Sequence, residues 1–126
     1  AVVFSDQKQL DILNSITHPN VKKAILESME EQKKSGCRLY VLEAALLIQD
    51  GYLDICDEMW YVYADVSKRI ERLCAYRGFT DEKARKVIAS QEPDSYYEEN
   101  CSKKIDNSGN LEKLRNQLKL AMGIEC

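Results

Sequence analysis

Glycine is scarce in this sequence, and its spacing excludes the glycine-rich loops that hold nucleotide phosphates. The 126 residues include five glycines: Gly36, Gly51, Gly78, Gly109 and Gly123. Neither GxxxxGK[ST] nor GxGxxG can be built from them, although both motifs need closely spaced glycines whose backbone N–H groups surround a phosphate. By its own residues, the chain therefore has no loop of this kind.

Histidine is almost absent, and the cysteines are scattered. His18 is the only histidine, and no two of the five cysteines form a CxxC pair. A structural zinc site needs four such ligands, usually at close spacing. An odd number of widely spaced cysteines also argues against a disulfide framework. We therefore expect no metal site and reduced, mostly buried thiols in a cytoplasmic protein.

Long apolar runs and strong net charge are missing as well. No run reaches the 18 or so apolar residues of a membrane-spanning helix. The net charge of −3 argues against a general nucleic-acid binder. The length of 126 residues, with 44% hydrophobic and 31% charged residues, is typical of one globular domain. We expect neither nucleic acid nor a membrane as a partner.

The longest apolar segment present is Leu39–Ile48, which only Glu43 interrupts. Flanking glycines bound it, and it predicts a strand over Leu39–Leu42 that is buried on both faces of a parallel sheet. Glu43 would then lie near the carboxyl end of the strand, where open α/β sheets bind ligands. A carboxylate in such a run must be paired or lie at the edge of a site. Both interpretations stay open.

Apolar spacing and helix-breaking residues predict the other elements. A first helix is expected from Ser5-Asp6 to Ile16, ended by Thr17-His18-Pro19 because proline cannot continue it. The remaining expected elements are a helix over about Asn20–Lys34, a strand over Met59–Ala64, helices from Asp65 or Ser67 to Arg77 and from Thr80 to about Gln91, a polar link over Asp94–Asn100, a short strand at Lys104-Ile105, a turn over Asp106–Gly109 and a helix over Leu111–Met122. This alternation favours an α/β fold with a parallel sheet.

Arginines gather on or just after the helix that follows the Met59–Ala64 strand. Arg69 and Arg72 are three residues apart and share a helix face, and Arg77 precedes Gly78 at the break. Arginine binds phosphate oxygens through two parallel hydrogen bonds. The pattern fits either a hinged basic flap over a phosphate or a solvated helix face.

Three further candidates also have ordinary structural explanations. His18, before Pro19, could be catalytic or could simply join two helices. Asn107 and Gly109 could contact a ligand or could simply form the turn.

A resemblance to a known family rests on segments that follow one another along nearly the whole chain. They are His18-Pro19, Val41–Gly51, Asp57–Tyr63, Arg69–Leu73, Arg77–Glu82, Gln91 and Ile105–Gly109. In this order and spacing they resemble the dephospho-CoA kinase family. The resemblance implies transfer of the ATP γ-phosphate to the ribose 3′-hydroxyl of dephospho-CoA, the last step of CoA synthesis, in the cytoplasm.

The resemblance also implies the fold and its parts. The expected fold is an incomplete three-layer α/β fold of the P-loop NTPase type, with a reduced parallel sheet flanked by helices and a helical lid. Its parts would be a helical CoA-side segment over 1–36, core strands and a helix over 37–76, the lid over 77–100, and a core strand with the C-terminal helix over 101–126.

By the same resemblance, the site residues fall into three groups. The substrate side comprises His18, Pro19, Glu43, Leu46, Leu47 and Gln49, with Gln49 where the family usually has glutamate. The lid set is Arg72, Arg77, Gly78 and Gln91, and Arg77 would contact phosphates. Val87 stands where many members have a lid arginine. Asn107 and Gly109 would lie near the nucleotide base.

The family's phosphate-loop strand and helix, and the acid that activates the acceptor hydroxyl, have no counterpart here. ATP and Mg²⁺ are therefore expected in a full-length enzyme, neither is expected bound to this chain, and the chain alone should be inactive. Without that strand the sheet has an exposed edge, which predicts a non-standard sheet or an intimate or swapped homodimer. Two alternatives remain: a CoA- or nucleotide-binding or interaction domain without a phosphate loop, and another nucleoside or nucleotide kinase.

Overall fold

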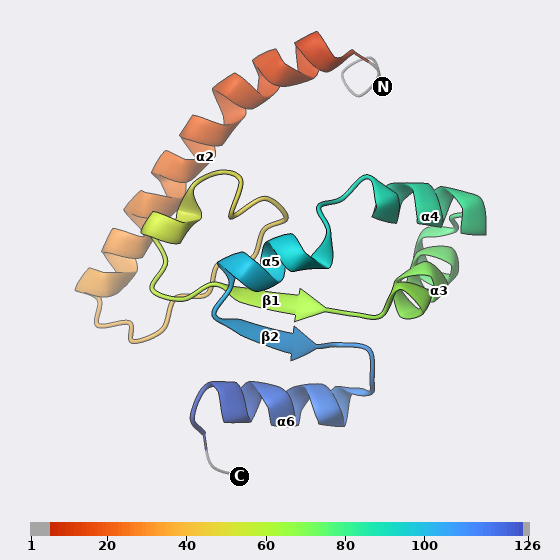
Figure 1. The fold of residues 1–126 in the computed structure, drawn as a ribbon. Helices are drawn as coiled ribbons and strands as arrows, with labels where there is room; N and C mark the ends of the chain where they lie inside the picture. Colours follow the sequence, from red (N-terminus) through yellow and green to blue (C-terminus); the bar gives the residue numbers. More distant parts are fainter. Residues whose placement is uncertain (1–5, 125–126) are drawn as a thin grey trace. The chain divides into compact units, whose positions relative to one another are not determined.

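The computed structural model describes residues 6–124, which divide into two compact units (Figure 1). Unit 1 is the described chain up to Gly51, and unit 2 is the described chain from Tyr52. No described helix is both long enough and apolar enough to cross a membrane.

Unit 1 is built on one long helix, α2, which spans Gln7–Lys34. The Asp6 side chain caps its first turn by accepting hydrogen bonds from the N–H groups of Lys8 and Gln9. At its end, Gly36 takes a positive φ of 87°, which suits glycine after a helix terminus. The two helices predicted on either side of His18-Pro19 are therefore one, and the predicted break was wrong.

Helix α2 continues through Pro19 because its surroundings tolerate the missing N–H. Thr17 Oγ1 donates to the Leu13 carbonyl at 2.9 Å, and Asn20 Nδ2 donates to the Ile16 carbonyl at 2.7 Å. These side-chain bonds add to the backbone ladder on both sides of the proline. Ser15, whose carbonyl loses its usual donor, is exposed, so water can reach that carbonyl.

The strand predicted over Leu39–Leu42 is not present; this segment is irregular. A strand exists only through its ladder with a neighbour, and the structure pairs no described segment with this one. The apolar side chains are consequently uncovered, with Leu39 60% and Val41 78% exposed. Residues 45–51 follow as a series of turns, in which Asp50 N donates to the Leu46 carbonyl at 2.9 Å.

Unit 2 contains a parallel two-stranded sheet of β1, Trp60–Tyr63, and β2, Lys103–Asp106 (Figure 1). Trp60 lies opposite Lys103, and the register continues to Tyr63 opposite Asp106. Both strands fall where the sequence predicted them, and they run parallel, as the α/β prediction expected. A short 3-10 helix, η1, spans Tyr52–Asp54 before β1.

Helices connect and flank the two strands. Helix α3, Val66–Arg77, ends at Gly78 in the left-handed conformation, and α4, Asp81–Ala89, is capped by the Thr80 side chain. Helix α6, Leu111–Ala121, is capped by Asn110 and packs against β2. These three helices agree with the sequence prediction.

Helix α5, Asp94–Asn100, replaces the polar link that the sequence predicted there. Pro93 stands at its N-cap, and Asp94 places a negative charge in the first turn, where the helix dipole favours it. The ring of Tyr97 stacks on Tyr61 of β1, with centroids 5.0 Å apart. The polar composition of this segment did not indicate a helix, and the contact between Tyr97 and Tyr61 stabilises the short helix that forms.

The buried apolar side chains of the described chain lie in unit 2. They are Tyr52, Met59, Ile70, Ala84 and Ile105. Burying one large aliphatic side chain stabilises a fold by roughly 1.5–3 kcal/mol. Unit 1 has no residue of this class between 6 and 51, so its helix depends mainly on local bonds.

Candidate functional site

In unit 1, helix α2 meets the 45–51 turn through Asp50. His18 Nδ1 lies 3.4 Å from Asp50 Oδ1, and Lys22 Nζ donates to the Asp50 backbone carbonyl at 3.1 Å. His18 and Lys22 are four residues apart, so they occupy one helix face. Both contacts therefore fix the turn against the same side of α2.

These contacts bring part of the predicted substrate-side set together. Gln49 is next to Asp50, and Leu46 and Leu47 belong to the same turn as both. Pro19 is exposed on α2, beside His18. Glu43 is exposed, and within residues 6–124 its carboxylate makes no hydrogen bond or ion pair, so the structural pairing considered for it finds no partner there.

In unit 2, a hollow of about 420 Å³ lies between α3 and the loop of residues 107–110. Its volume is within the range of small-molecule sites. The lining residues are Lys68, Glu71, Arg72, Ala75, Tyr76, Ser108, Gly109 and Asn110. Two residues from different predicted groups, Arg72 and Gly109, thus share one surface.

Arg72 connects the two walls of this hollow. Its Nη2 donates to the Asn107 backbone carbonyl at 2.7 Å, and the Asn107 N–H donates to the Tyr63 carbonyl at 2.6 Å. A hydrogen bond from a charged guanidinium is stronger than one between neutral groups. The loop therefore continues from the end of the sheet and is anchored on α3.

Ser108 fixes the loop at a second point. Its Oγ accepts from the Asp65 N–H at 2.8 Å, and its own N–H donates to Asp106 Oδ1 at 2.8 Å. Hydrogen bonds to the Asp106 carboxylate from the Ser108 side chain and the Ser108 N–H, helped by the nearby Lys104 ammonium, lower the pKa of the Asp106 carboxyl. The loop is thus held before any ligand binds.

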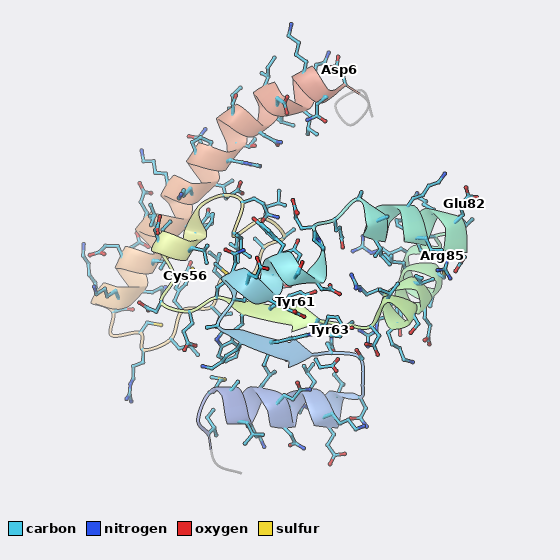
Figure 2. All side chains as sticks on the ribbon, viewed as in Figure 1. Asp6, Cys56, Tyr61, Tyr63, Glu82 and Arg85 are labelled. Atoms are coloured by element: carbon cyan, nitrogen blue, oxygen red, sulfur yellow. The ribbon has the colours of Figure 1, made fainter. Side chains whose placement is uncertain are left out.

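Of the predicted lid residues, Arg72 takes part in these contacts, and the other three lie apart from them. Arg77 is the last residue of α3 and is exposed, Gly78 ends the helix with φ 65°, and Gln91 follows α4 and is exposed. Arg85 pairs with Asp81 at 2.7 Å along α4. Figure 2 shows Arg85 and Glu82 on this helix. Neither Arg77 nor Gln91 lines the hollow.

A third cluster, which the sequence did not indicate, involves Tyr61, Asp94 and Arg69. Tyr61 Oη donates to Asp94 Oδ1 at 2.6 Å, and Arg69 Nη2 lies 3.6 Å from the same oxygen. Burial, followed by the Asp94 carboxylate, raises the pKa of Tyr61. Arg69, a candidate phosphate ligand by sequence, is instead directed to a carboxylate that anchors α5.

The described residues do not fit a magnesium site. No three or more His, Cys, Asp or Glu side chains of residues 6–124 come together as metal ligands. Magnesium is held by carboxylate, phosphate and water oxygens. The one carboxylate at the hollow, Glu71, pairs with Lys68 at 3.1 Å.

Asp50 and Tyr76 were missed by the sequence analysis. Asp50 was noted as the boundary of an apolar run and as part of the Val41–Gly51 segment but given no role, although an acid after that run could have been matched with the lone histidine. Tyr76 is four residues after Arg72, so helical periodicity alone placed both on one face.

Comparison with solved structures defines the class of fold. A crystal structure of a Thermus thermophilus protein matches with a TM-score of 0.74 at 26% identity, covering 97% of this chain and 62% of that one. A dephospho-CoA kinase from Campylobacter jejuni matches with a TM-score of 0.61 at 22% identity, covering 97% and 63%. The chain therefore has part of the α/β fold of these proteins, as expected.

Sequence comparison then defines the family. The family model of dephospho-CoA kinase matches residues 1–113. Dephospho-CoA kinases from Carboxydothermus hydrogenoformans and Geobacillus kaustophilus are 36% and 34% identical over 93% and 94% of this chain. The chain belongs to the dephospho-CoA kinase family, and it spans 57% and 59% of the length of these two relatives.

Proposed function

We propose that this chain supplies the acceptor side, the lid and the base-binding side of a cytoplasmic dephospho-CoA kinase. The reaction would transfer the ATP γ-phosphate to the ribose 3′-hydroxyl of dephospho-CoA. The observation that carries the proposal is the 2.7 Å bond between Arg72 and the Asn107 carbonyl. Arg72 and Asn107 are 35 residues apart in sequence, and the bond joins two segments of the family resemblance at one hollow.

On the acceptor side, His18 and Pro19 of α2 and Leu46, Leu47 and Gln49 of the turn would contact dephospho-CoA. The His18–Asp50 contact supports this assignment because it holds the two segments together. Glu43 is unpaired within residues 6–124 and exposed, so its carboxylate is available to a polar group of the substrate.

On the nucleotide side, Asn107 and Gly109 would lie near the base, and Arg72, expected from the resemblance in the lid, would hold the loop that carries them. Gly109 has no side chain, and a Cβ there would lie 3.2 Å from Cδ of the Lys113 side chain, which would have to shift slightly. In the lid, Arg77 would approach the phosphates by movement about Gly78, and Gln91 would end the moving segment.

Phosphate and Mg²⁺ binding would be supplied by residues outside the described segment. ATP provides the phosphoryl group and Mg²⁺ neutralises its charge during transfer. Because residues 6–124 have neither a phosphate loop nor magnesium ligands, we propose that this chain alone is inactive.

The test is to join this chain to the N-terminal portion of the Carboxydothermus hydrogenoformans relative and to measure phosphate transfer from ATP. The chimera should phosphorylate dephospho-CoA, whereas the chain alone should not. Preference for a nucleoside or nucleoside monophosphate would instead favour a different kinase. Ligand binding by a folded chimera without turnover would favour a binding module.

Arg77→Ala in the chimera should lower turnover more than it lowers stability, because Arg77 is exposed at the lid hinge. Arg115→Ala is the matched control, since Arg115 is exposed on α6 and does not line the hollow. Equal effects of the two substitutions would remove Arg77 from the proposed machinery.

A further inference from the structure

Tyr76 is an aromatic side chain that the fold leaves uncovered at the wall of the hollow. It is 85% exposed, although aromatic side chains usually bury large areas in cores and interfaces. It lies one helical turn beyond Arg72 and lines the same hollow. Packing within the described chain gives no reason for an aromatic ring here.

The surroundings of Tyr76 are fixed while its ring is free. The Arg72 guanidinium is held by the Asn107 carbonyl, and Ser108 is held by Asp65 and Asp106. A preformed polar loop therefore faces a helix that presents an exposed aromatic ring. This combination suits a flat aromatic ligand, because the ring offers a stacking face and the loop offers hydrogen-bonding groups.

We propose that Tyr76 is the stacking wall for the base of the bound nucleotide. The inference rests on the proposed function, which places a nucleotide in this hollow, and it adds the residue that holds the base. Stacking acts on the planar base and not on the phosphates, so it needs no phosphate loop. A nucleoside is therefore the appropriate probe for this chain.

The magnitude follows from known base–aromatic stacking. Removing an aromatic platform weakens binding by about 5-fold to 140-fold. Tyr76→Ala should show a loss in this range, and Tyr76→Leu should show most of it, because leucine restores apolar area without a ring. Tyr76→Phe should bind like the natural chain, because the ring is kept.

The experiment is an NMR titration of the ¹⁵N-labelled 126-residue chain with adenosine at millimolar concentrations. Adenosine should shift the amide signals of Tyr76, Ser108 and Gly109. Leu120→Ala is the matched control, since Leu120 is 80% exposed on α6 and does not line the hollow. It should leave the affinity unchanged. Because Tyr76 is exposed, its variants should keep the natural circular dichroism spectrum.

Three results would overturn the inference: no adenosine-induced shifts at the hollow, natural affinity in Tyr76→Ala, or equally strong binding of ribose 5-phosphate, which lacks a base.

The chimera separates this inference from the proposed function. An active chimera whose KM for ATP is unchanged by Tyr76→Ala would contradict only the stacking role. Stacking of adenosine in a chain whose chimera has no kinase activity would contradict only the proposed reaction.

Discussion

Replacing Pro19 with alanine tests the continuous helix α2. Proline in a helix interior is about 3 kcal/mol less favourable than alanine. Part of this gain is offset, because proline also restricts the unfolded chain, an effect of about 0.4–1 kcal/mol. The substitution should therefore stabilise α2 by about 2 kcal/mol.

Hydrogen exchange gives the appropriate assay, because it reports the stability of the helix separately from unit 2. A gain of about 2 kcal/mol corresponds to roughly thirtyfold slower exchange of the amides of residues 20–26. Glu27→Ala is the control, since Glu27 is exposed on the same helix and such substitutions usually change stability by less than about 0.5 kcal/mol. Unchanged or faster exchange in Pro19→Ala would show that the chain breaks at Pro19 in solution, and the reasoning would fail.

Three other predictions follow from the structure. The pKa of Asp106 is lowered on folding, so its carboxylate adds stability above an unfolded pKa of about 4, and this stability is lost as the pH falls through the folded pKa. Urea melts should therefore show Asp106→Asn less stable than the natural chain at neutral pH, and the difference should disappear in acid. The pKa of Tyr61 is raised, so the contribution of Tyr61 to stability is full below about pH 10 and falls as the pH rises through the folded pKa. Phenolate absorbance should show a strongly ionisation-resistant component that is lost in Tyr61→Phe. The exposed Leu39–Leu42 segment should promote self-association, so light scattering after size exclusion should give a dimer, and Val41→Lys should give a monomer, whereas a stable natural monomer would refute this prediction.

Much of unit 2 could be predicted from local signals. The aromatic and β-branched run over Trp60–Tyr63 favours a strand, and Thr80, Gly78 and Asn110 mark helix ends through side-chain caps or a left-handed backbone. These signals act over a few residues, so sequence alone was sufficient.

The errors occurred where a local signal needed a wider context. Pro19 was expected to end a helix, but the neighbouring side-chain bonds and exposure allow it inside one. The Leu39–Leu42 segment has the composition of a strand but no described partner to pair with. The Asp94–Asn100 segment looked polar, yet Tyr97 stacks on Tyr61 across 36 positions of sequence.

In the candidate site too, sequence identified individual residues but not the contacts between them. Arg72, Asn107 and Gly109 were each identified by sequence, but in separate groups, because only the tertiary fold brings α3 beside the 107–110 loop. The assigned roles of these residues stay predictions. Asp50 was identified only in the structure, since its importance depends on contact with His18 across 32 positions of sequence.

The most direct test of the central claim is the identity of the product that the chimera makes from ATP and dephospho-CoA. Mass spectrometry and phosphorus NMR should identify CoA phosphorylated at the ribose 3′-hydroxyl, with no product from either part alone. A folded chimera that consumes no dephospho-CoA, or that phosphorylates another acceptor in preference, would contradict the claim that this chain carries the acceptor and base-binding sides of a dephospho-CoA kinase.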